Sequence, residues 1–237
     1  MIRNTLTSLS AFIALAACSF GTTSSAVGTV PLGPLERGVI SGWNAGDAVV
    51  YGTVGFFSPN PQIVAIGAVK PDGSFTVDYP AVLPQDVLVR PSAQCSTIQA
   101  SNPIVLTAFT GNDLIFQRGK LIGSIHSGSS LGVASFTSIA GGDTRTGYVY
   151  ASADTTQTGY CERTVKFGTY AVDFRQTFEL NLRKGWNMVV ADFSMPAPGH
   201  IVSDLKLGAN SAERFYFFAG ARCGGNCPRT HNGSRFN

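Results

Sequence analysis

The chain is poor in charged residues and lacks long hydrophobic runs. Asp, Glu, Lys and Arg make up 13% of its 237 residues, about half the share of a typical soluble protein. The net charge of +3 is too small to indicate a nucleic acid partner. After the N-terminal region, no segment approaches the roughly 18 consecutive apolar residues of a membrane-spanning helix.

The residues that are present indicate a folded, strand-rich protein. Hydrophobic residues make up 44% of the chain and aromatic residues 11%, which is enough for a core and excludes a disordered chain. Short apolar runs alternate with glycine, proline and asparagine, and none combines a 3.6-residue period with capping residues. We therefore expect an all-β protein with few helices, built as one antiparallel β-sandwich or as two abutting sandwich-like modules.

The clearest strand covers residues 170–182. Its even positions are apolar and its odd positions from Asp173 onward are polar, except that Gln176 interrupts the apolar face. This interruption predicts a bulge or a bend. Lys184 and Gly185 follow as a turn, and the segment 186–193 is the expected hairpin partner.

The N-terminus has the pattern of an export signal. Arg3 is followed by a mostly apolar segment that is too short to cross a bilayer and ends at Leu15-Ala16-Ala17-Cys18. This ending resembles the lipobox of bacterial lipoproteins. The resemblance implies lipidation of Cys18, cleavage just before it, and a membrane-anchored protein that faces the periplasm or the cell surface. An ordinary secretory signal that happens to carry a cysteine is the alternative.

Lipidation would account for the odd number of cysteines. Of the five, four would remain, and in an oxidising compartment an even number favours two disulfides. Three pairings are possible, and we favour Cys223–Cys227, which flanks flexible glycines, and Cys95–Cys161, which would close a long loop. Cys223, Cys227 and His231 could instead hold a metal, but the glycines and a proline among them argue against a helix there. We predict no metal site and no cofactor.

The expected organisation has five parts. They are a signal peptide at 1–17, a lipidated tether at 18–35, a first β module at 36–110, a second β module at 111–221, and a basic tail at 222–237 pinned by a disulfide. Gly38, Gly67 and the segment Asp72-Gly73-Ser74-Phe75, together with the turn from Leu182 to Asn187, resemble the β-sandwich modules of uncharacterised envelope lipoproteins.

One motif carries a catalytic interpretation. Gly128-Ser129-Ser130-Leu131-Gly132 matches the G-x-S-x-G nucleophile elbow, with Asp143 and His200 downstream. The residues after Ser130 are poor helix formers and the alternation of strands and helices is absent, so we predict no catalytic residue. The expected role is a non-catalytic envelope component or binding module that contacts an envelope protein or a glycan. A secreted hydrolase, and a small-ligand carrier with an apolar cavity in a closed barrel, are the alternatives.

Overall fold

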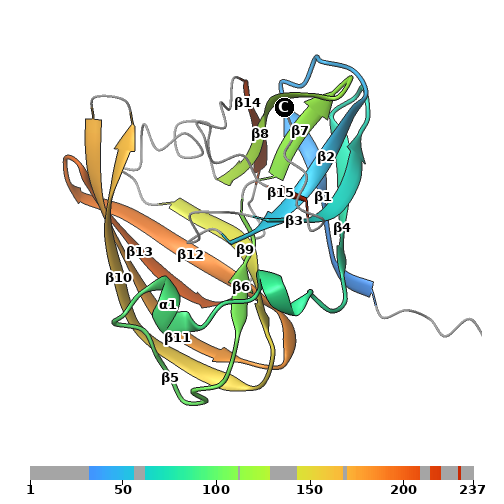
Figure 1. Cartoon of the computed structure of the whole chain (residues 1–237). Coiled ribbons are helices and arrows are strands. Elements are labelled where there is room, and N and C mark those ends of the chain that lie inside the picture. Colours follow the sequence, from blue (N-terminus) through green and yellow to red (C-terminus); the bar gives the residue numbers. More distant parts are fainter. Residues whose placement is uncertain are drawn as a thin grey trace, which may run out of the picture. The chain divides into compact units, whose positions relative to one another are not determined.

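The structure, a computed structural model, describes residues 32–55, 62–111, 113–128, 143–167, 170–208, 214–219 and 229–230. Strands dominate these residues (Figure 1), and their helices are the 3-10 turn η1 (Gln85–Val87) and the single-turn α1 (Pro91–Gln94). The predictions of an all-β protein and of few helices are therefore confirmed. Within the described ranges, no helix has the length and apolarity needed to cross a membrane.

The first sheet closes on itself. Its strands are β1 (Leu32–Ser41), β2 (Ala48–Val54), β3 (Gln62–Val69), β4 (Ser74–Pro80), β7 (Asp113–Gln117), β8 (Lys120–Gly128), β14 (Arg214–Ala219) and β15 (Arg229–Thr230). They follow the order β15-β3-β2-β7-β8-β14-β1-β4, and β3 also pairs with β4. That extra pairing joins the strands from β3 to β4 into a closed barrel, which removes the free edges of an open sheet.

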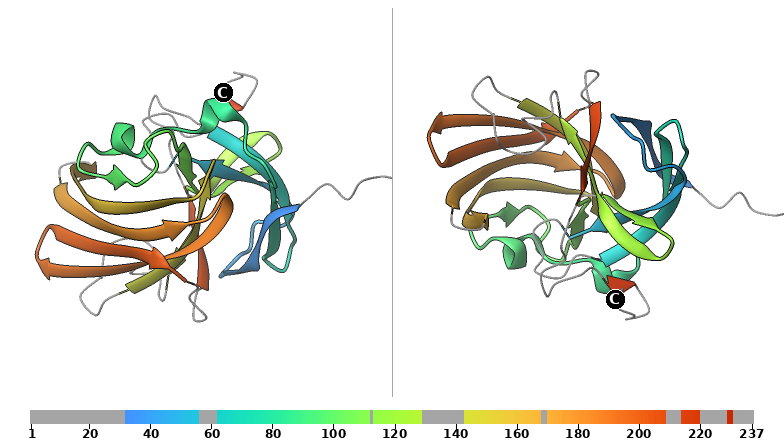
Figure 2. Two further views of the ribbon diagram at one scale, coloured as in Figure 1. Left: turned by 90° about the horizontal axis from the view of Figure 1, so that it is seen from below. Right: turned by 90° about the horizontal axis from the view of Figure 1, so that it is seen from above.

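The second sheet is curled and open. Its strands are β5 (Gln99–Ala100), β6 (Thr107–Phe109), β9 (Asp143–Ala151), β10 (Thr155–Phe167), β11 (Tyr170–Leu182), β12 (Gly185–Ala197) and β13 (His200–Leu207). The order is β5-β10-β11-β13-β12-β9-β6, and Figure 2 shows the curvature of the long strands. Most strand pairs are antiparallel, as expected, but the pairs β1–β14, β3–β15 and β11–β13 are parallel, so both sheets are mixed.

Both sheets draw strands from both sides of residue 110. β5 and β6 come before it and join the second sheet, whereas β7, β8, β14 and β15 come after it and join the first sheet. Residues 31–237 form one structural unit. β1 begins at Leu32, inside the stretch that the sequence assigns to the tether.

The structure corrects the predicted hairpin. β11 covers the predicted residues 170–182, and β12 follows after the expected turn at Lys184 and Gly185. The two strands are not paired, because β13 lies between them, parallel to β11 and antiparallel to β12. Gln176 also makes no bulge, since β10 and β11 stay in register along their whole length. Alternation and turn residues define a strand and its ends, but not its lateral neighbour.

Each sheet has its own apolar core. The core of the second sheet contains Phe178, Leu180, Leu182, Val149 and Val105 together with other buried residues. They pack between the strands of this sheet and the segments that connect them. Arg175 and Glu179 are exposed while Phe174 and Leu180 are buried, as the alternation along β11 predicts.

A smaller core inside the first sheet includes three valines, Val50, Val69 and Val77, together with Phe75 and Ile115. Four aromatic residues, Trp43, Trp186, Phe215 and Phe217, pack against its margin.

Aromatic residues join the two sheets. The indole nitrogen of Trp186 on β12 donates a hydrogen bond to the carbonyl oxygen of Pro80 (2.8 Å), and its ring centroid lies 5.4 Å from that of Tyr79. The Tyr79 hydroxyl donates to Oδ1 of Asp113 on β7 at 3.1 Å. Asp113 is buried, and burial raises the pKa of its carboxyl from 3.8 to about 7.

Candidate ligand-binding site

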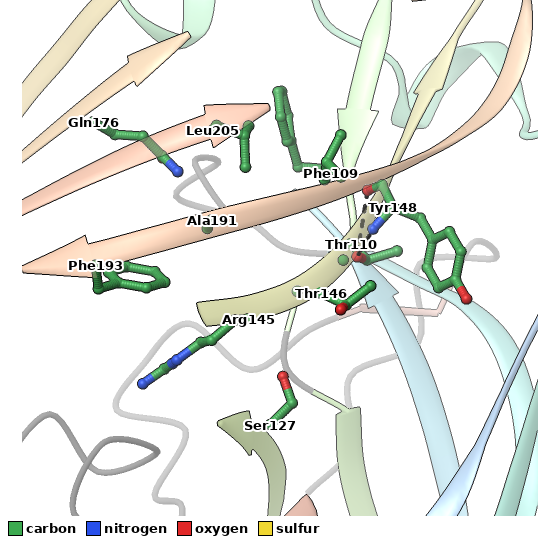
Figure 3. Close-up of a pocket in the computed structure, with 13 residues that line it drawn as sticks. Phe109, Thr110, Ser127, Arg145, Thr146, Tyr148, Gln176, Ala191, Phe193 and Leu205 are labelled. Atoms are coloured by element: carbon green, nitrogen blue, oxygen red, sulfur yellow. Dashed lines mark hydrogen bonds between the residues drawn. The ribbon is translucent and has the colours of Figure 1, made fainter. Parts of the chain in front are cut away.

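A pocket of about 110 Å³ lies on the core-facing side of the second sheet (Figure 3). β9, β12, β11 and β13 supply most of its wall, and β8 contributes one residue. Its lining residues are Phe109, Thr110, Gly111, Ser127, Arg145, Thr146, Gly147, Tyr148, Gln176, Val189, Ala191, Phe193 and Leu205. The pocket is small beside the 300 Å³ or more typical of sites for drug-sized ligands.

Alternation along the strands produces an apolar wall. Val189, Ala191 and Phe193 are successive core-facing residues of β12, and all three are buried. Leu205 of β13 and Phe109 of β6 complete this wall. Such a surface binds the hydrocarbon part of a ligand by the hydrophobic effect.

Gln176 places an amide within this apolar wall. Its side chain is 3% exposed, and its Nε2 donates a hydrogen bond to Oγ of Ser203 on β13 at 3.4 Å. Its Oε1 has no hydrogen-bond partner in the described part of the structure. A buried acceptor without a partner costs about 1–3 kcal/mol, so a donor bound in the pocket would remove this cost.

Gly147 keeps the neighbouring wall open. It lies on β9, and a Cβ built at this position would be 3.4 Å from Oγ1 of Thr110 and 4.0 Å from Val189. Alanine therefore fits here without a clash, whereas a longer side chain would project into the pocket.

Polar groups gather on another part of the lining. Arg145 of β9 places its guanidinium carbon 5.0 Å from the centroid of the Phe193 ring, a cation–π contact. Oγ1 of Thr110 accepts a hydrogen bond from the backbone nitrogen of Tyr148 at 2.9 Å. Ser127 at the end of β8 adds a hydroxyl group. The pocket thus combines an apolar wall, a buried amide and a cationic group.

A second hollow, of about 760 Å³, lies where β10, β11 and β13 run together. Four of its charged side chains are solvated and paired with one another. Arg175 pairs with Glu162 at 3.3 Å, and His200 Nδ1 is 3.7 Å from Asp173 Oδ2, with every side chain at least half exposed. Exposed pairs of this kind contribute little. We therefore consider the first pocket the stronger site.

The Cys95 and Cys161 thiols come together as expected, but no bond joins them. Both cysteines are free in this structure, and their side chains are within hydrogen-bonding reach of each other. Burial raises the pKa of the Cys161 thiol to about 12. Burial also acts to raise the pKa of the Cys95 thiol, but hydrogen bonds from Cys161 and Thr97 bring it below its usual value. The predicted disulfide stays a prediction.

The other predicted site residues fall mostly outside the described residues. Cys18, Cys223 and Cys227 lie outside the described residues, and so does Ser130 of the nucleophile-elbow motif, for which no catalytic role was predicted. His200 begins β13 and pairs with Asp173 on the adjacent strand. No cluster of three or more His, Cys, Asp or Glu side chains that could hold a metal occurs within the described ranges.

Sequence reasoning missed most of the pocket. One signal was available, because Gln176 interrupts an otherwise apolar strand face, but a bulge explained it equally well. Arg145 and Gly147 were not recognised because no strand was predicted at residues 143–151, although a glycine inside a strand is itself unusual. The pocket depends on pairings between distant strands, which local patterns do not show.

No protein-family model, curated protein or solved structure matches this chain.

Proposed function

We propose that this protein is a non-catalytic, lipid-anchored envelope protein that binds a small ligand in the pocket of the second sheet. The observation that carries this proposal is the Gln176 side chain, 3% exposed, whose Oε1 has no partner within the described residues and which lines an otherwise apolar wall. A purely structural core would gain stability from an apolar residue at this position.

A second buried amide supports the same interpretation. Gln157 on β10 is fully buried, and in the described part of the structure neither its Oε1 nor its Nε2 has a hydrogen-bond partner. Gln157 belongs to the same sheet as Gln176. Buried polar groups without partners mark places where water or a ligand completes the hydrogen bonding.

The anchoring part of the proposal comes from the N-terminal sequence. Leu15-Ala16-Ala17-Cys18 resembles a lipobox, and a lipidated Cys18 would hold the folded body at a membrane facing the periplasm or the cell surface. For the body we propose a sandwich-like packing of the two sheets, based on the contacts of Trp186 with Tyr79 and Pro80. An envelope protein or a glycan is the kind of partner expected for such a module.

Native mass spectrometry of the full-length protein, purified in detergent from its own envelope, tests ligand binding. We expect the wild-type protein to carry a small molecule in addition to its lipid. Gly147→Leu should lose it because leucine fills the pocket, whereas Gly147→Ala should keep it because a Cβ fits there. A wild-type protein that carries only its lipid would contradict the proposal, and so would a ligand retained equally by Gly147→Leu.

A further inference from the structure

The pocket wall points to one class of ligand, and this inference rests on the function proposed above. Two features of the wall select the ligand. One is the buried Oε1 of Gln176, which has no hydrogen-bond partner among the described residues. The other is the group of apolar side chains beside it, which are Leu205, Ala191 and Phe193.

Strand pairing places these apolar residues close to Gln176 on the same face of the sheet. Gln176 on β11 is opposite Ser203 on β13, and Leu205 is the next buried residue of β13. On β12, Phe193 is opposite Ser203. Ala191, also on β12, is opposite Leu205. Two strand spacings, about 10 Å in all, separate β11 from β12. The Gln176 side chain covers part of this distance, and a single six-membered ring would fill the rest.

The small side chain of Ala191 leaves space for such a ring. Figure 3 shows the amide end of Gln176 turned towards Leu205, with Ala191 and Phe193 on the neighbouring strand. The pocket measures about 110 Å³, and an apolar cavity of about 150 Å³ holds benzene. This volume limits the ligand to a single ring or a short alkyl chain.

Gln176 selects a hydrogen-bond donor. Its Nε2 donates to Oγ of Ser203, so Oε1 remains for a ligand, and an amide oxygen only accepts hydrogen bonds. An ammonium group would donate, but a charge without a counterion is strongly unfavourable beside apolar residues. An amide would bring further polar atoms that the apolar residues cannot bond. A hydroxyl donates one hydrogen bond and carries no charge, so it matches this acceptor best.

We infer that the pocket binds a small neutral alcohol, either a phenol or a short alkanol. Its hydroxyl donates to Gln176 Oε1, and its hydrocarbon part packs against Leu205, Ala191 and Phe193. The hydroxyl removes the cost of burying an acceptor without a partner, and the hydrophobic effect binds the hydrocarbon part. Arg145 lies over the Phe193 ring and needs no contact with this ligand.

Three probes of similar size separate the contributions. Phenol carries the hydroxyl, toluene has a methyl group in its place, and pyridine can only accept a hydrogen bond. Equilibrium dialysis of the full-length protein, with the same detergent on both sides, measures binding without counting the partition into micelles. We expect phenol to bind at least tenfold more tightly than toluene or pyridine, because either analogue leaves Gln176 Oε1 without a donor.

Substitutions assign this preference to Gln176. Gln176→Leu should bind phenol no more tightly than toluene, because leucine offers no acceptor. Gln99→Leu is the matched control and should keep the preference, because Gln99 is an exposed glutamine of the same sheet outside the pocket. Gly147→Leu should weaken the binding of all three probes. Unchanged far-ultraviolet circular dichroism would show that each variant is folded, and the three probes test the hydroxyl in the wild-type protein without any variant.

The outcomes distinguish this inference from the function on which it rests. Equal affinities for phenol and toluene would overturn the ligand class, and so would pyridine as the tightest probe or an intact preference for phenol in Gln176→Leu. If no probe binds but the envelope-purified protein carries another compound that Gly147→Leu excludes, the ligand class is wrong and the binding function stands. If neither a probe nor a co-purified compound is found, both are wrong.

Discussion

Asp113 and Gln176 are polar residues in largely apolar interiors, and each is held by one hydrogen bond. Asp113 accepts a hydrogen bond from the Tyr79 hydroxyl, and Gln176 donates to Ser203. Each keeps one buried oxygen without a partner in the described part of the protein. For Asp113 this environment makes the stability of the fold depend on pH.

The Asp113 carboxyl should destabilise the protein as the pH rises. Burial raises its pKa from 3.8 to about 7, so between about pH 4 and pH 7 it ionises in the unfolded chain but stays protonated in the folded protein. The contribution of this group to the free energy of unfolding is therefore greatest below pH 4. As the pH rises to 7, this contribution decreases by on the order of a few kcal/mol. Asp113→Asn keeps an acceptor for Tyr79 and cannot ionise.

Urea unfolding at pH 5 and pH 8 tests this. The loss of stability between the two pH values should be smaller in Asp113→Asn than in the wild-type protein, and the variant should be the more stable of the two at pH 8. An identical pH dependence in both proteins would contradict the assigned pKa.

Single residues also show where the sequence was informative and where it was not. The alternation along residues 170–182 correctly placed Phe174 and Leu180 inside and Arg175 outside. The same pattern singled out Gln176, but it could not reveal Ser203 beside it, because β13 reaches that position only through a parallel pairing.

At the scale of elements, the pairing of β3 with β4 closes the first sheet. Gly67 on β3 is opposite Val77 on β4, and a Cβ at Gly67 would lie 1.7 Å from the backbone oxygen of Thr76. Gly67→Ala should therefore push the two strands apart and cost roughly 1–3 kcal/mol.

Thermal unfolding provides the measurement, and Gly147→Ala provides the control. Its added Cβ makes no contact shorter than 3.4 Å, so its midpoint should stay close to that of the wild-type protein. Equal midpoints for Gly67→Ala and the wild-type protein would mean that β3 and β4 do not approach as closely as described.

The segment around α1 contacts β10 where the thiols of Cys95 and Cys161 lie close together. Cys95 follows α1, and its thiol donates a hydrogen bond to the carbonyl oxygen of Tyr160 at 3.5 Å, beside Cys161. If the exported protein oxidises this pair, the disulfide would close a long loop and stabilise the fold by roughly 4 kcal/mol.

Reductant should then lower the unfolding midpoint of the wild-type protein and leave that of Cys95→Ser unchanged. Cys227→Ser should lose much less stability than Cys95→Ser, because its predicted loop is short. Two unmodified thiols at Cys95 and Cys161 in protein taken directly from the envelope would contradict the disulfide.

Elements were predictable where the signal is local. Strand ends and the turn at Lys184 and Gly185 follow from alternation and turn residues. The lateral order of the strands does not, because β13 enters between β11 and β12 from later in the chain. The closure of the first sheet likewise depends on the pairs β1–β14, β8–β14 and β2–β7, which join strands that are far apart in the sequence.

At the scale of the whole molecule, we propose that a lipid anchor at Cys18 holds the folded β-body at a membrane. Cys18→Ala should move the protein from the membrane fraction to the soluble or unprocessed fraction without changing its thermal unfolding, because residue 18 precedes the unit formed by residues 31–237. Mass spectrometry of the N-terminal peptide checks the modification directly. An unmodified Cys18, or cleavage at another bond, would contradict the anchor.

The central claim is that the pocket of the second sheet holds a small ligand in the native protein. A high-resolution crystal structure of wild-type protein purified from its own envelope, without added ligand, tests it most directly. We expect electron density for a small organic molecule over Ala191, with a donor atom within hydrogen-bond distance of Gln176 Oε1. Density for water alone at Gln176, or a pocket filled by the protein's own side chains, would contradict it.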